Sequence, residues 1–144
     1  MSKWLDRADL LKAHLEGVAG LSEIPVEVDR QKDINSVIAG AIAEASGACI
    51  TILWTGGGNP DPKSNDLRMG GRFTVTVNGL EILREGATPL DEIAETVAEA
   101  MHDWNPNADD PNHRTHRLYV TDIQLAPHEH FLVYEIEGEI LRMN

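Results

Sequence analysis

Residues 88–104 read TPLDEIAETVAEAMHDW, and this stretch carries the clearest structural signal in the chain. Its apolar side chains recur every three or four residues, with carboxylates between them, which is the pattern of an amphipathic helix. Thr88 is expected to cap this helix, with Pro89 at its first position and Asp91 as a short capping-box acid. Asn105-Pro106 is expected to end it. The stripe predicted to face the core is Leu90, Ile93, Ala94, Val97, Ala98, Met101 and Trp104.

Outward from this helix, apolar spacing predicts further elements on both sides. They are a helix over 4–16, an edge strand over 24–28, a helix over 34–45, a strand over 48–54 buried on both faces, a strand from 72, a strand from 118 and a final strand over 131–142 paired with it as a hairpin. This order predicts one α+β domain over residues 1–144, with a mostly antiparallel β-sheet covered by two to three α-helices.

A long glycine-rich loop is predicted over residues 55–71, which read TGGGNPDPKSNDLRMGG. The segment holds five glycines and two prolines and has no helical or strand period. It is longer than most connections in a compact domain, and such loops are usually either functional or disordered. We expect it to become ordered against a neighbouring molecule.

The segment after this loop has two interpretations. Asn78-Gly79 is a strong signal for a two-residue hairpin turn. The alternation of residues 72–85 also fits one long strand with a glycine bulge. We favour the bulged strand.

Charge and composition exclude several classes of protein. The chain has 144 residues, with 24 acidic against 12 basic side chains and a formal charge of -12. Binding to nucleic acids depends on lysines and arginines, so this balance argues against it. An export signal and a membrane span are not expected, because no apolar run approaches about 20 residues. Cys49 lies alone in an apolar run and is expected to be a small buried hydrophobe, suited to a reducing cytoplasm.

Motifs for catalysis are weak. The run Gly56-Gly57-Gly58 lacks the lysine and helix of a phosphate-binding loop, and there is no nucleophile elbow. A metal hypothesis rests on His113, His116, His128 and His130, whose positions in or next to predicted turns also suit solvated loop histidines. We therefore predict that the protein is not an enzyme and has no cofactor.

The last strand predicts a row of negative charge. If the apolar positions of residues 132–140 face the core, Glu135, Glu137 and Glu139 lie together on the other face. Such a row is either a soluble surface or, in a ring, a charged wall. The candidate interaction residues are Gly56, Gly57, Gly58, Arg68, Arg72, Glu135, Glu137 and Glu139.

From Phe73 to Leu141 the order of elements resembles the phage tail terminator, or tail completion, proteins. The features in common are the long strand from Arg72, the helix opened by Thr88-Pro89 and the closing hairpin over 118–141. The segment 101–106, MHDWNP, which closes the helix, belongs to the same likeness. The resemblance extends more loosely to the N-terminal helix, the strand at Pro25 and the second helix. It does not require the glycines of the long loop.

The resemblance implies a structural subunit that forms a six-membered ring, caps the tail tube, stops its polymerisation and joins the tail to the head. Its partners would be copies of itself, the tail tube protein and a neck or head completion protein, and it allows a contact with a tail sheath. Such a protein is made in the host bacterial cytoplasm and resides in the virion. DNA would pass through its lumen without specific binding, beside Glu135, Glu137 and Glu139 or the carboxylates of the third helix. The alternatives are a small histidine-dependent metal enzyme and a cytoplasmic protein-interaction module.

Overall fold

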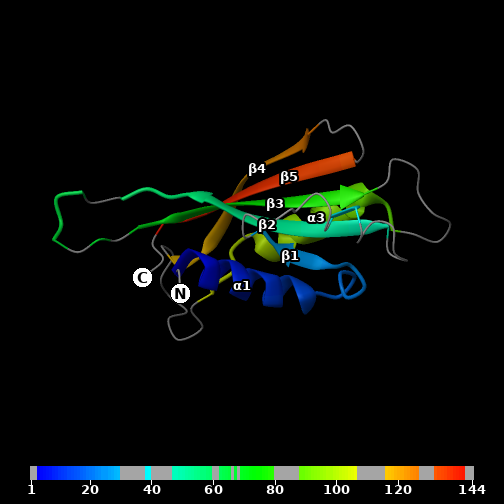
Figure 1. The fold of residues 1–144 in the computed structure, drawn as a ribbon, viewed down its shortest axis with the longest axis horizontal. Helices are drawn as coiled ribbons and strands as arrows, with labels where there is room; N and C mark the ends of the chain where they lie inside the picture. Colours follow the sequence, from blue (N-terminus) through cyan, green and yellow to red (C-terminus); the bar gives the residue numbers. More distant parts are fainter. Residues whose placement is uncertain are drawn as a thin grey trace.

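A five-stranded sheet with helices packed on one face forms the framework of the protein (Figure 1). The computed structural model describes residues 3–29, 38–39, 47–59, 62–65, 67, 69–79, 88–106, 116–126 and 132–141. The elements are α1 (Lys3–Glu16), β1 (Val26–Val28), β2 (Ala48–Gly56), β3 (Gly71–Gly79), α3 (Leu90–Met101), β4 (Leu118–Ala126) and β5 (Leu132–Ile140).

The strands lie in the order β1-β2-β3-β5-β4. β1 runs parallel to β2, and the other neighbouring pairs are antiparallel. The predicted α+β fold is therefore confirmed. The predicted edge position of the first strand and the pairing of the last two strands are confirmed as well.

The core lies between the sheet and the two helices α1 and α3. Alternate residues of β3 face it, and Phe73, Val75 and Val77 are at most 1% exposed. The predicted stripe of α3 is buried from Leu90 to Met101, as the helical spacing requires. His14 of α1 joins the two helices, because its Nε2 donates to the carbonyl oxygen of Ala100 at 2.7 Å. Its ring also stacks on Trp104, with centroids 4.9 Å apart.

The start of α3 differs from the predicted capping box. Pro89 is the N-cap, with φ −56° and ψ 143°, and the first helical residue is Leu90. No side chain donates or accepts a capping hydrogen bond there. The prediction was wrong by one residue because Pro89 holds an extended ψ, which moves Thr88 out of capping position. The first helical bond runs from the Ile93 amide to the Pro89 carbonyl.

The end of α3 also comes earlier than Asn105-Pro106. His102 has extended backbone, and Asp103 adopts the left-handed region at φ 64°. The chain then turns so that Trp104 forms an isolated antiparallel bridge with Leu118, the first residue of β4. Trp104 still contacts the core, but from the connection rather than from the helix.

Two other predictions hold only in part. β2 is buried on both faces from Ala48 to Ile52, whereas Leu53 beyond them is 37% exposed. Of the second helix, only residues 38–39 are described, and both are helical. β3 runs through Asn78 to Gly79, and the test between hairpin and bulge lies in residues 80–87, outside the described segments. In the segments described, no helix is long and apolar enough to span a membrane.

Cys49 is the buried hydrophobe that the sequence predicts. Its side chain is 0% exposed within β2. Burial, assisted by the negative charge of Glu27, raises the pKa of this thiol to about 11. The thiolate, which is the nucleophilic form, is therefore suppressed at neutral pH.

Candidate interaction surface

The face of the sheet opposite α1 and α3 carries the polar side chains. On β5, Ile136 and Ile140 are buried in the core, so Glu135, Glu137 and Glu139 lie on the opposite face, as predicted. The register places cross-strand neighbours beside them on the same face. These neighbours are Thr76, Thr74 and Arg72 on β3, and Gln124, Asp122 and Tyr119 on β4.

This polar face divides into a buried half and an exposed half. At the end nearest Gly79, Cys49, Thr51 and Asn78 are at most 5% exposed. There the Asn78 side chain donates to the Cys49 carbonyl at 3.2 Å, and the hydroxyls of Thr51 and Thr76 are hydrogen-bonded to each other. The buried polar groups are thereby satisfied. The other half of the face is open, and it is the half available to a partner.

The open half is acidic along β4 and β5. Asp122 and Glu137 are directly opposite each other across these strands, and both are exposed. Gln124 Nε2 donates to Glu135 Oε2 at 3.2 Å and holds that carboxylate in place. Residues 118–126 and 132–141 contain four carboxylates and no lysine or arginine. The sequence could reveal this row because a strand has a period of two.

The long loop forms an arm that leaves the sheet as a continuation of β2 and β3 (Figure 1). We define the arm as residues 55–71. Its two sides stay paired beyond the strands, because the Gly70 amide donates to the Gly58 carbonyl at 2.8 Å. The glycine-rich loop is thus a ribbon at its root rather than an irregular segment.

Glycine is required at the arm root because the backbones approach closely. A Cβ on Gly57 would lie 2.0 Å from the Gly70 oxygen. One on Gly70 would lie 2.6 Å from the Ile140 oxygen. Gly56 has φ 138°, which side chains rarely adopt. These glycines allow the two sides of the arm and the end of β5 to meet.

A polar pocket of about 210 Å³ opens where the arm joins the sheet. It brings together Arg72 and Glu137, two predicted residues that are far apart in the sequence. Sequence reasoning missed Thr121, because a register irregularity between Val120 and Asp122 sets its place. Arg68 lies outside the described residues, and Glu135 lies further along the face. The lining is Thr55, Arg72, Phe73, Thr121, Glu137 and Gly138.

The described histidines make structural contacts. The amide of Val120 donates to His102 Nδ1 at 3.1 Å, which ties the end of α3 to β4. Of the four histidines in the metal hypothesis, only His116 is described. Within the described segments, no three histidine, cysteine or acidic side chains are grouped as metal ligands.

Comparisons with known proteins add no assignment. No protein-family model matches the sequence, and no curated protein matches it significantly. The functional argument therefore depends on the surface geometry and on the pattern of elements.

Proposed function

We propose that this chain is a phage tail terminator subunit, which forms a ring on the end of the tail tube and joins it to the neck. The observation that supports this most is the acidic open half of the sheet. Four carboxylates lie on the β4–β5 ribbon, and the described residues of that ribbon carry no positive charge. The order of elements shared with the tail terminator proteins supports the same function.

The acidic surface has a physical purpose in such a ring. DNA that passes through a channel must not adhere to its wall, and carboxylates repel the phosphate backbone. Exposed charges act over about 10 Å at 0.1 M salt, so only residues near the channel contribute. Glu135, Glu137 and Glu139 are on a strand in the interior of the sheet, which holds them in a fixed row. We assign them to the wall.

Loss of the protein is expected to leave tails without a defined end. Deleting the gene from the phage or prophage that carries it should give tails of uncontrolled length or tails that fail to join heads. Electron microscopy of negatively stained particles measures both outcomes, and a plasmid copy of the gene should restore normal particles. Normal tails joined to heads in the deletion strain would contradict the proposal.

Lysine at Glu135, Glu137 and Glu139 is expected to slow DNA passage. The triple variant should still assemble, because the three side chains are outside the core, but the new positive charges should retain DNA. The rate of DNA ejection from purified particles measures this effect, which should be largest at low ionic strength.

A matched control has the same change of charge on another surface. Glu92, Glu95 and Glu99 are exposed on the outer side of α3, and lysine at these positions should leave ejection unchanged. If both triple variants eject DNA at the wild-type rate at every salt concentration, Glu135, Glu137 and Glu139 do not line the DNA path.

A further inference from the structure

The outer edge of β4 is an unusual surface for a protein that remains alone. β4 is the last strand of the sheet and pairs with β5 on one side. Its first residue, Leu118, is bridged to Trp104 on the other side. From Thr121 to Leu125 every side chain is exposed, including Ile123 at 47% and Leu125 at 54%. An exposed edge strand with apolar side chains is a template for strand addition.

The arm has properties that match this edge. Leu67 is 65% exposed, and Lys63 is the one charged side chain among the arm's described residues. The whole segment 55–72 has three basic and two acidic residues, in a chain whose net charge is -12. The β4 edge has the opposite character, with Asp122 on the strand and Glu135 and Glu137 beside it. Apolar and charged features are therefore complementary between the two surfaces.

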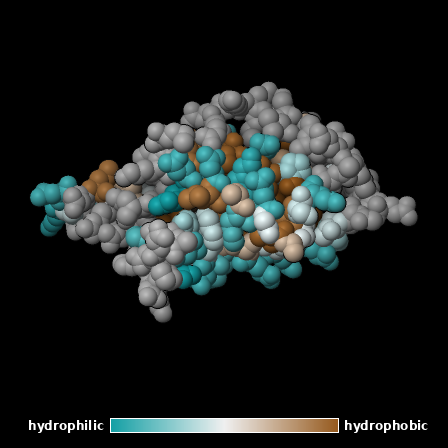
Figure 2. Space-filling model, turned by 90° about the horizontal axis from the view of Figure 1, so that it is seen from below, coloured by the Kyte–Doolittle hydropathy of each residue, from teal (hydrophilic) through white to brown (hydrophobic). Residues whose placement is uncertain are grey.

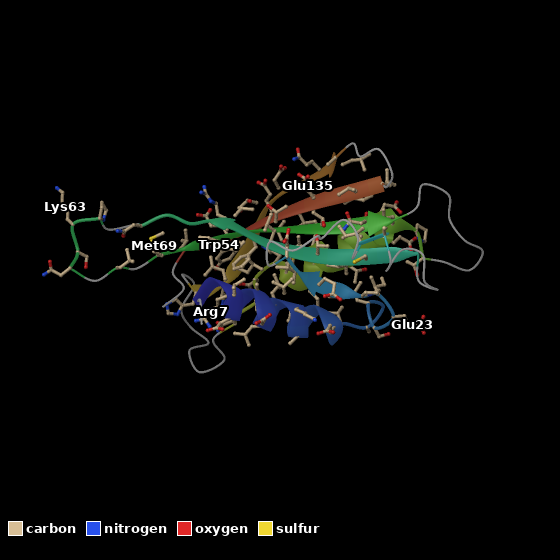
Figure 3. All side chains as sticks on the ribbon, in the orientation of Figure 1. Arg7, Glu23, Trp54, Lys63, Met69 and Glu135 are labelled. Carbon is tan, nitrogen blue, oxygen red and sulfur yellow. The ribbon has the colours of Figure 1, made fainter. Side chains whose placement is uncertain are left out.

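The arm cannot satisfy the β4 edge of its own chain. Figure 3 places Lys63 at the outer end of the arm and Glu135 on the body of the sheet, well apart, with Trp54 near the arm root between them. Figure 2 shows the arm projecting at one end of the molecule, with hydrophobic atoms on it beside hydrophilic ones. The glycine contacts at the root extend the ribbon away from the sheet. The matching surfaces can meet only between two copies.

We infer that the arm of one copy docks on the β4 edge of the next copy. Leu67 then covers Ile123 and Leu125, and Lys63 lies near the carboxylates of Asp122 and Glu137. Because each copy uses two different surfaces, the contact is heterologous and repeats head to tail. The inference rests on the proposed function for the ring into which the contact closes, and it names the two surfaces that would build that ring.

Cross-linking of purified protein tests the contact directly. In a Cys49→Ala background, a double variant with Leu67→Cys and Leu125→Cys should give a ladder of disulfide-linked oligomers on mild oxidation. The matched control combines Leu67→Cys with Leu10→Cys, which changes an exposed residue of α1 (42% exposed) and should give no ladder. Equal ladders from both pairs, or none from either pair, would overturn the inference.

Charge exchange provides an independent measurement that needs no disulfide. Lys63→Glu should weaken self-association about tenfold in analytical ultracentrifugation. Adding Asp122→Lys to that variant should restore it, because the pair is then reversed. Failure of the second change to restore association, or a strictly monomeric wild-type chain at its highest soluble concentration, refutes the contact.

These results are distinguishable from a failure of the proposed function. A chain that cross-links from arm to edge but is dispensable for tails retains the contact and loses the function. A chain whose deletion gives unterminated tails, but whose arm does not cross-link to the edge, retains the function and loses the contact.

Discussion

Val97→Asp is expected to destabilise the protein by about 4 kcal/mol or more, enough to unfold a typical domain of this size. Val97 is 0% exposed and belongs to the core between α3 and the sheet. A carboxylate there loses its hydration, and the apolar side chains of the core offer it no compensating partner. Urea denaturation followed by circular dichroism should show a large fall in the midpoint or no folded protein at all.

The control places the same residue on the outer face of the same helix. Glu95 is exposed on α3, and Glu95→Asp should change the free energy of unfolding by less than about 0.5 kcal/mol. A soluble, cooperatively folded Val97→Asp variant with an unchanged midpoint would mean that α3 packs through another face.

Gly57→Ala is expected to separate the two sides of the arm at its root. The added Cβ would be 2.0 Å from the backbone oxygen of Gly70, which has no side-chain freedom to move away. Relieving this contact breaks the hydrogen bond from the Gly70 amide to the Gly58 carbonyl, at a cost of about 2 kcal/mol. Hydrogen exchange at the Gly70 amide should accelerate strongly, and the urea midpoint should fall.

The neighbouring glycine is a matched control. A Cβ on Gly58 would meet nothing within 4 Å, and its φ is not in the left-handed region. Gly58→Ala should therefore leave exchange at Gly70 close to wild type. Equal effects of the two alanines would show that composition, rather than the close approach of the backbones, governs the arm.

Much of the fold could be predicted because its elements carry local periodicity. The stripe of α3 and the alternation of β3 each define one buried face, and both faces meet in the core. The errors at the ends of α3 have a different origin. They depend on the ψ of Pro89 and the left-handed turn at Asp103, which a pattern of apolar residues does not determine.

The candidate surface could be predicted only in pieces. The row of glutamates follows from strand alternation, so Glu135, Glu137 and Glu139 were found together. Glycine-rich sequence has no period, so nothing local shows that Gly58 pairs with Gly70. The pocket beside Arg72 depends on how β4, β5 and the arm meet, and such long-range contacts leave no signal within any one segment.

The unlike edges of the sheet give the molecule a direction. One edge is β1, a strand of three residues beside α1, and the other is β4, a strand of nine. Copies joined through such different borders share no two-fold axis, so any closed assembly has a top that is chemically distinct from its bottom. Such an object can be inserted into a larger structure in one orientation only. A component placed between two different neighbours needs this polarity, since it must never be installed upside down.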